Sequence, residues 1–197
     1  MDWKRLILVC VAFGAIGCAA LNQTNPFSES HEWVGDGLPL LRKVSDRLHV
    51  GGQPSKEGLA RLKGMGVKTV INVRESESAE RRERKVCEEL GMEYVALPVP
   101  CGGPMSDGTV EAFFGIVRDS KRSPVFLHCM TGRDRASTFA ALYRVAEEGW
   151  TADQAYAEML RCEFNAGLTD LSQYVYDFAK RKRTAQAPTD EGGIPSR

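Results

Sequence analysis

The chain has few of the residues from which metal and nucleic-acid sites are built. Its 197 residues include only 3 His, at positions 31, 49 and 128, and its 6 Cys form no CxxC pair, which argues against a zinc site. Lys and Arg together number 26, as do Asp and Glu, so the formal net charge is zero and no nucleic-acid partner is expected. Any cationic function must therefore be local.

The chain also lacks an apolar run that would span a bilayer comfortably. The run at residues 6–17 follows Lys4 and Arg5 and is short, so it predicts an export signal. Its end, AIGC, resembles a bacterial lipobox, in which Cys18 is acylated and becomes the mature N-terminus. An uncleaved signal anchor is the alternative. Both place the domain outside the cytoplasm at a membrane surface, facing the periplasm or the cell exterior, where disulfides are favoured.

Composition divides the chain into four segments. Residues 1–18 are the predicted signal peptide with its lipobox, and residues 19–41, rich in Asn, Ser, Gly and Pro, suit a tether. Residues 42–183 are the predicted domain, and residues 184–197 are a polar tail that we expect to be flexible. The length and a hydrophobic content of 43% fit one domain with an ordinary core.

Strand and helix patterns alternate through the predicted domain. We expect strands at residues 48–51, 68–74, 92–99 and 124–129. Helices are expected after Ser55 with Met65 inward, at residues 78–90, around 110–117, at 135–148, after the capping pair Thr151 and Gln154, and around 171–178. The charge run AERRERK in the second helix is interpreted as a solvated face. The alternation predicts an α/β fold with a mainly parallel central sheet flanked by helices, and a binding crevice at the carboxyl ends of its strands.

The stretch HCMTGRDRAST begins at one such strand end, and Cys129 opens the turn into a helix. Small residues before a helix direct backbone N–H groups toward one point, which makes an anion cradle and stabilises a nucleophilic thiolate at Cys129. Arg135 supplies a planar, bidentate donor for a phosphoryl group, and Gly132 lets the backbone approach the bound oxygens closely. The predicted phosphate-binding residues are Met130, Thr131, Gly132, Arg133, Asp134 and Arg135.

HCMTGRDR matches HCxxGxxR and resembles the signature of the cysteine-dependent tyrosine and dual-specificity phosphatases. The likeness extends from about residue 48 to residue 178, where GGQPSKEGLARLKGMGVKTVINVR and GWTADQAYAEM are similar to compact bacterial dual-specificity-like members. The resemblance implies a phosphatase fold with a strand, a phosphate loop and a helix in succession. It also implies that Cys129 attacks phosphorus, that water then frees the phosphocysteine, and that Arg135 stabilises both transition states. No metal or cofactor is implied.

The general acid departs from the family's pattern. The family usually places an Asp in the loop after the third strand, here LPVPCGGPMSDG, and Cys101 stands where that Asp is expected. Asp107 and Asp134 are the candidate acids, and a site with neither is the third possibility. Asp107 could instead favour a helix start, and Asp134 could pair with Arg133.

Cys101 is a candidate resolving partner for Cys129 after oxidation. A buried Cys101, or one paired with Cys87 or Cys162, is an equally open alternative. The residue after the arginine is also unusual, because the family has Ser or Thr there and this chain has Ala136, with Ser137 one place later. Slow release of the thiolate from the intermediate is one consequence to expect.

The sequence therefore predicts an exported, lipid-anchored phosphomonoester hydrolase of the tyrosine and dual-specificity type. The alternative is a catalytically weak, phosphate-binding pseudophosphatase, which Ala136 and the displaced acid suggest. A rhodanese-like sulfurtransferase ranks third, because its loop typically closes on a shorter spacing. The expected site is shallow, and the substrate could be a phosphoprotein, a phosphoinositide or an inositol phosphate.

Overall fold

The computed structural model describes residues 37–186. The predicted signal, the lipobox at Cys18 and tail residues 187–197 lie outside the described residues. The described elements are β1 (Arg42–Lys43), β2 (Leu48–Gly51), α1 (Lys56–Gly64), β3 (Thr69–Asn72), α2 (Glu77–Glu89), β4 (Glu93–Ala96), α3 (Asp107–Arg118), β5 (Val125–His128), α4 (Arg135–Glu147), α5 (Ala152–Arg161) and α6 (Thr169–Gln186).

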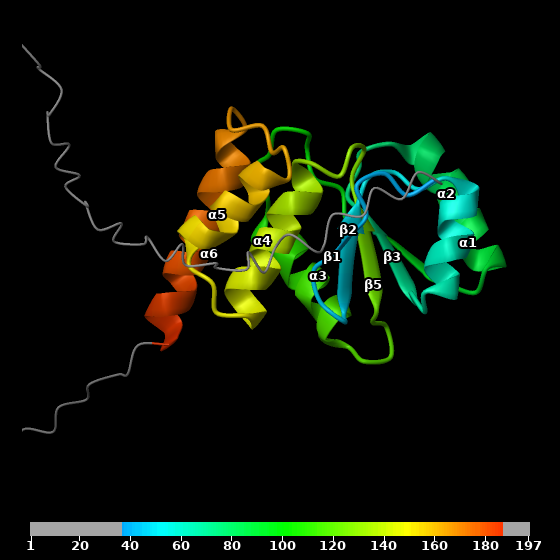
Figure 1. Cartoon of the computed structure of the whole chain (residues 1–197), viewed down its shortest axis with the longest axis horizontal. Coiled ribbons are helices and arrows are strands. Elements are labelled where there is room, and N and C mark those ends of the chain that lie inside the picture. Colours follow the sequence, from blue (N-terminus) through cyan, green and yellow to red (C-terminus); the bar gives the residue numbers. More distant parts are fainter. Residues whose placement is uncertain (1–36, 187–197) are drawn as a thin grey trace, which may run out of the picture.

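A 5-stranded sheet in the order β1-β2-β5-β3-β4 forms the centre of the fold (Figure 1). The pairs β2–β5, β5–β3 and β3–β4 are parallel, which confirms the predicted mainly parallel sheet. β1 pairs antiparallel with β2 and was not predicted, because its two residues are too few to show an alternating pattern.

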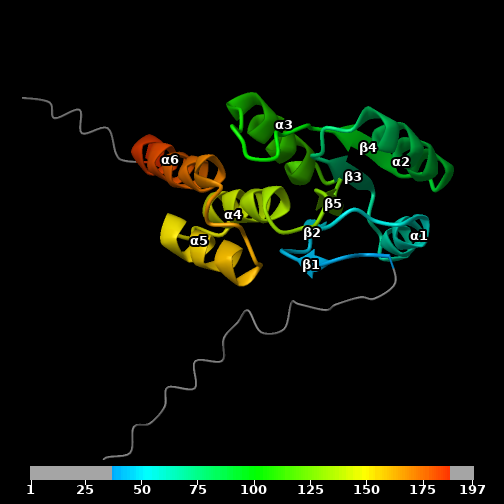
Figure 2. The same cartoon turned by 90° about the horizontal axis from the view of Figure 1, so that it is seen from above.

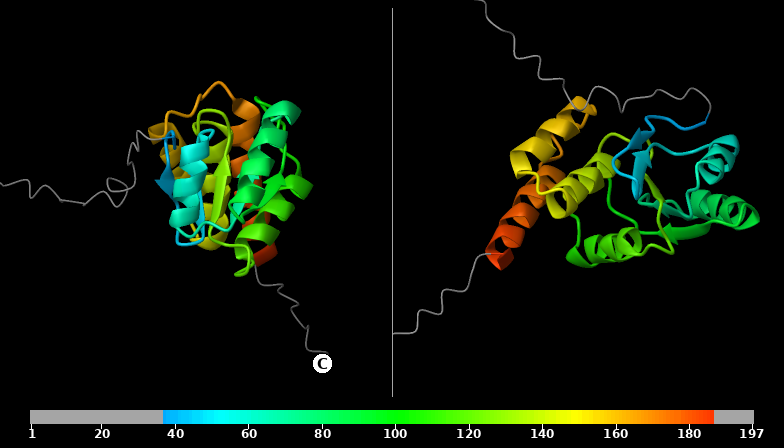
Figure 3. Two further views of the ribbon diagram at one scale, coloured as in Figure 1. Left: turned by 90° about the vertical axis from the view of Figure 1, so that its right-hand side faces the viewer. Right: turned by 60° about the horizontal axis from the view of Figure 1, so that its bottom comes forward.

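Helices cover both faces of the sheet (Figure 2). One apolar cluster joins Leu59 and Leu62 of α1 and Cys87 of α2 to Phe126 of β5. The other faces α3 and α4 and includes Leu127, the next residue of the same strand. β5 is thus buried on both sides, and its carboxyl end lies in the middle of the sheet edge. α5 and α6 pack outside α4, at the opposite end of the molecule from α1 and α2 (Figures 1 and 3).

Two predicted helix starts are confirmed by their caps. Ser55 Oγ accepts a hydrogen bond from the backbone N of Gly58 at 3.1 Å. At α5, Thr151 Oγ1 accepts from the backbone N of Gln154, and Gln154 Oε1 accepts from the backbone N of Thr151, which completes a capping box. The inward orientation expected for Met65 is wrong: the residue is 46% exposed, because α1 ends at Gly64.

The packed part of the chain extends past both expected domain boundaries. Leu38 and Leu41, assigned above to the tether, are buried in the cluster that contains α1. Gly37 O also accepts a hydrogen bond from the backbone N of Ser55 at 2.8 Å. At the other end, α6 continues beyond residue 183 to Gln186. Residues 37–41 are too short a stretch to show a periodicity, so their packing could not be anticipated.

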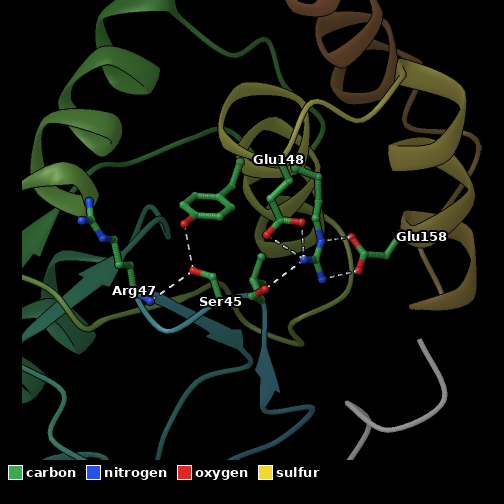
Figure 4. A network of polar contacts seen from close by, with 7 residues as sticks. Ser45, Arg47, Glu148 and Glu158 are labelled. Atoms are coloured by element: carbon green, nitrogen blue, oxygen red, sulfur yellow. Dashed lines mark hydrogen bonds and ion pairs between the residues drawn. The ribbon is translucent and has the colours of Figure 1, made fainter. Parts of the chain in front are cut away.

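A polar network ties α4 to the turn between β1 and β2 (Figure 4). Arg144 Nη1 donates to Val44 O at 2.9 Å and Nη2 to Glu158 Oε1 at 3.0 Å, while Tyr143 shares a hydrogen bond with Ser45 at 2.9 Å. The Arg144 and Glu158 side chains are each only 12% exposed, so this ion pair is little screened by solvent. The network fixes the position of α4, the helix that begins at Arg135.

Candidate active site

The segment between β5 and α4, residues 129–134, forms a compact loop at the carboxyl end of the sheet. Cys129 is 2% exposed, and the backbone N of Gly132 donates to its Sγ at 3.3 Å. Gly132 has φ +83°, and a Cβ there would lie 2.6 Å from the backbone N of Gly52. Only glycine fits this position, because the backbone is left-handed and the end of β2 packs directly against the loop.

Backbone hydrogen bonds join the loop to the chain that follows β2. The backbone N of Cys129 donates to Gly51 O at 3.3 Å, and that of Gln53 donates to Met130 O at 3.0 Å. The side chains of Met130 and Thr131 are exposed. These two residues can therefore contribute to anion binding through their backbone and not through a buried side chain.

Arg135 is the first residue of α4 and is 8% exposed. Its Nη1 donates to Val73 O at 3.3 Å and to Val99 O at 3.0 Å, the carbonyls just beyond β3 and β4. Both bonds come from Nη1, so the guanidinium can present Nε and Nη2 to a bound anion. The structure thus brings Cys129, the loop amides and Arg135 together at one edge of the sheet.

Arg42 of β1 donates hydrogen bonds to the loop and to the start of α4, a role that the sequence did not indicate. It is 5% exposed, and its Nη2 donates to Gly132 O at 3.0 Å and to Ser137 Oγ at 2.8 Å. Its Nη1 lies 2.6 Å from Cys162 Sγ. Burial raises the pKa of the Cys162 thiol, and the charge of Arg42 opposes that shift. No motif marks Arg42, so only the fold reveals its place.

A buried pair of side chains lies under Cys129. His128 is fully buried, its Nδ1 lies 3.1 Å from Cys129 O, and its Nε2 lies 2.9 Å from Glu83 Oε1. Asn72 Nδ2 donates to the other oxygen of Glu83 at 3.1 Å. The prediction that AERRERK forms a solvated face is therefore wrong at Glu83. Spacing could have indicated the burial of this residue, because Glu83 lies one helical turn before the buried Cys87.

The two candidate acids are held by different elements. Asp107 begins α3, and its Oδ1 accepts hydrogen bonds from Tyr174 at 2.5 Å and from Arg181 at 3.0 Å, both on α6. Burial, and then the hydrogen bond to Asp107, raise the pKa of the Tyr174 phenol. Asp134 Oδ1 accepts from the backbone N of Asn165 at 2.9 Å.

The expected pairing of Asp134 with Arg133 is not formed. Arg133 Nη2 instead lies 2.9 Å from Glu163 Oε2, and both side chains are substantially exposed. Asp134 also makes no capping bond to α4. Its carboxyl group therefore connects the phosphate loop to the segment between α5 and α6.

Ala136 is fully buried, and the Ser137 hydroxyl is occupied by its contacts with Arg42 and with Gly132 O at 3.5 Å.

All four cysteines of residues 37–186 are free: Cys101 is exposed, and Cys87, Cys129 and Cys162 are buried. The alternative pairings of Cys101 with Cys87 or Cys162 are thus absent from the described fold.

Within residues 37–186, no group of three or more His, Cys, Asp and Glu side chains could hold a metal ion. No helix in the same range is long and apolar enough to cross a membrane.

Comparison with known proteins places the chain among phosphatases. The family model described as a DSP-PTPase phosphatase fused to NAD+ kinase matches residues 28–177. The dual specificity protein phosphatase TpbA of Pseudomonas aeruginosa UCBPP-PA14 is 27% identical over 180 residues, 89% of this chain and 80% of that protein. A DUF442 protein structure from Shewanella putrefaciens CN-32 is 29% identical, with a TM-score of 0.61 over 74% of this chain and 92% of that chain. The structure of P. aeruginosa TpbA with phosphotyrosine is 22% identical, with a TM-score of 0.58 over 79% of this chain and 100% of that chain.

Proposed function

The chain belongs to the DSP-PTPase phosphatase family and is a cysteine-based phosphatase, and from this premise we propose how its own residues hydrolyse a phosphomonoester. Cys129 is the nucleophile. The observation that carries the proposal is the Gly132 N–H directed at Cys129 Sγ at 3.3 Å, at the point where β5 meets α4. The sulfur therefore lies at the start of α4, where it can attack a phosphoryl group bound by the loop amides.

The reaction has two steps. In the first, the thiolate forms an S–P bond while the P–O bond to the leaving group breaks and the leaving oxygen takes up a proton. In the second, water attacks the phosphocysteine, loses a proton, and breaks the S–P bond, which returns the thiolate and releases inorganic phosphate. Arg135 and the loop amides bind the equatorial oxygens, where negative charge concentrates in both transition states.

We assign the general acid to Asp134. It lies within the phosphate loop, whereas Asp107 is bound to Tyr174 and Arg181 on α6 and would have to leave an ion pair to reach a leaving group. The position of Asp134 within residues 129–135, the segment that carries Cys129 and Arg135, supports this assignment.

A weakly active pseudophosphatase is the second candidate, and one observation favours it. No hydroxyl follows Arg135 directly, since Ala136 occupies that position and the Ser137 hydroxyl is engaged by Arg42. Without a hydroxyl to stabilise the departing thiolate, the second step becomes slow. A pseudophosphatase would bind phosphate yet show no sustained turnover.

The substrate is a phosphorylated molecule, and we include phosphotyrosine among the candidates because a TpbA structure holds it. We further propose that the protein is exported and anchored by lipid at Cys18, on the strength of the apolar run and the AIGC sequence.

Hydrolysis of an aryl phosphate in the presence of a chelator tests the proposed function. We expect multiple turnovers by the parent, because Cys129 and Arg135 need no metal, and none by Cys129→Ser. Binding of phosphate without turnover would instead support the pseudophosphatase. Activity that chelator abolishes would contradict the mechanism.

A further inference from the structure

A cavity of about 420 Å³ opens next to Gln53, a residue that contacts the phosphate loop. Its walls come from the chain after β2, the first turn of α1, the chain after β3 and the first turns of α2, on the side of the molecule where α1 and α2 lie together (Figure 1). Its polar lining residues include Gln53, Lys56, Arg74, Ser76, Arg82 and Glu83.

Hydrogen bonds join the lining of this cavity to the phosphate loop and to Arg135. The backbone N of Gln53 donates to Met130 O at 3.0 Å, and the Gln53 side chain accepts a hydrogen bond from Arg74. Arg74 follows Val73, whose carbonyl accepts from Arg135 Nη1 at 3.3 Å. The cavity and the phosphate loop are therefore neighbours at the carboxyl edge of the sheet.

The cavity carries a local excess of positive charge. Lys56, Arg74 and Arg82 line it, and the carboxylate in its lining, Glu83, is turned toward His128 with its side chain only 4% exposed. Glu57, next to Lys56, is not part of the lining and bonds Ser55 Oγ at 2.8 Å. In a chain whose formal net charge is zero, this concentration of cations is a local feature.

The arginines of α2 differ in a way that singles out the cavity. Arg81 lies 3.7 Å from Glu77, and Arg84 lies 2.7 Å from Glu80. Arg82, which lines the cavity, has no ion pair or hydrogen bond with any residue of the described range 37–186. Its guanidinium is thus available to a bidentate acceptor such as a phosphate group.

The start of α2 adds donors to these charges. Ser76 is the N-cap residue, yet its side chain makes no capping hydrogen bond in the described structure. Ser76 lines the same cavity as the three cations, so the start of α2, with its unbonded first-turn N–H groups, lies at this cavity.

We propose that this cavity binds a second phosphate group of the substrate whose first phosphate is cleaved at Cys129. The inference rests on the proposed function of the phosphate loop and deepens it: the substrate class is a doubly phosphorylated small molecule or headgroup. Lys56, Arg74 and Arg82 match an anionic phosphate group, and they recognise it equally before and during the reaction. The second phosphate therefore lowers KM more than it changes kcat.

Calorimetric titration of the full chain in its Cys129→Ser form tests the proposal without requiring turnover. The probes are α,ω-alkanediol bisphosphates of increasing length and the matching alkyl monophosphates. We expect the bisphosphate that spans the two sites to bind at least about tenfold more tightly than its monophosphate. Equal affinity of every bisphosphate and its monophosphate would overturn the proposal.

A matched pair of charge removals locates the second phosphate. Arg82→Gln should remove most of the bisphosphate preference, whereas Arg81→Gln, one residue away and outside the cavity, should keep it. An equal loss in both variants would show general electrostatic attraction and would contradict a defined site. Circular dichroism of both variants checks that α2 is intact.

Two separate measurements identify the kind of second phosphate and test the proposed function. Inositol 1,4-bisphosphate and a short-chain, water-soluble phosphatidylinositol 4-phosphate share the inositol ring but carry the second phosphate as a monoester or as a lipid diester. If the Cys129→Ser protein binds one of these two ligands more tightly and Arg82→Gln removes the difference, the result supports the site. It also shows whether the second phosphate is a monoester or a lipid diester. If the parent protein fails to hydrolyse an aryl phosphate, the proposed function fails, while the bisphosphate preference of the Cys129→Ser protein still decides the inference.

Discussion

At the scale of single residues, the chemistry depends on groups that a motif reveals and on supports that it does not. Cys129, Gly132 and Arg135, the residues that we propose for catalysis and phosphate binding, could be located from HCMTGRDR, because their spacing follows from local backbone geometry. Glu83 and Arg42 could not, because each reaches the loop from a distant part of the chain and each is a charged residue of a kind that is usually exposed. Their burial shows only when the sheet places α2 and β1 against the loop.

The assignment of the acid makes a prediction at this scale. A proton donor matters most when the leaving group is a poor one, so Asp134→Asn should slow hydrolysis of an alkyl phosphate by roughly a hundredfold and affect an acidic phenol far less. Asp107→Asn is the matched control and should behave like the parent on both substrates. The reverse pattern, measured as kcat/KM for the two substrates, would move the role to Asp107.

The cysteines make a second prediction. Burial, followed by the charge of Glu83, raises the pKa of Cys87 to about 12, and burial raises that of Cys162. Both groups therefore stay protonated at about pH 8, where the thiolate is the reactive form, while Cys101 is exposed. Iodoacetamide treatment of the folded Cys129→Ser protein should label Cys101 first in peptide mapping. Early labelling of Cys87 or Cys162 would contradict the protection that we attribute to their burial.

At the scale of elements, β1 does more than extend the sheet. This strand of two residues carries Arg42 beneath the phosphate loop, where it bridges Gly132 O, Ser137 and Cys162. β1 is held in turn by its antiparallel pairing with β2 and by the contact of Arg144 with Val44. Through Arg42, the strand thus links the phosphate loop to residues of α4 and to the end of α5.

Replacing the buried arginine should therefore affect both stability and catalysis. Arg42→Ala leaves the buried Gly132 carbonyl and the buried Ser137 hydroxyl with only their long contact of 3.5 Å to each other, so we expect a loss of about 3 kcal/mol in the free energy of unfolding and a clear fall in kcat. Lys43→Ala is the control, because the Lys43 side chain is 59% exposed and its pair with Asp46 should contribute less than about 1 kcal/mol. Urea unfolding of both variants gives the comparison, and equal losses would contradict a special role for Arg42.

At the scale of the whole molecule, the regular parts of the fold were predictable and its irregular parts were not. The parallel strands and the helix caps follow from periodicity and from short-range hydrogen bonding, so the sequence indicated them correctly. Leu38 and Leu41 pack from a segment without periodicity, and the exposure of Met65 depends on where α1 ends. The cavity near Arg82 depends on how α1 and α2 sit together on the sheet, which no local pattern encodes.

The proposed location is a property of the whole chain. If Cys18 carries lipid, the parent protein should fractionate with membranes, and Cys18→Ala should become soluble or remain unprocessed, because acylation needs the thiol. Mass spectrometry of the purified N-terminal peptide and membrane fractionation measure the two effects. An unchanged mass and unchanged partitioning in the variant would favour a signal anchor.

The central claim is that Cys129 carries the phosphoryl group between the two steps. Acid quenching during turnover of an aryl phosphate, followed by peptide mass spectrometry, tests it directly. The account predicts a phosphoryl group on Cys129 in the parent, accumulating because Ala136 leaves the second step slow, and neither modification nor turnover in Cys129→Ser. A phosphoryl group on another residue, or turnover that survives in Cys129→Ser, would contradict it.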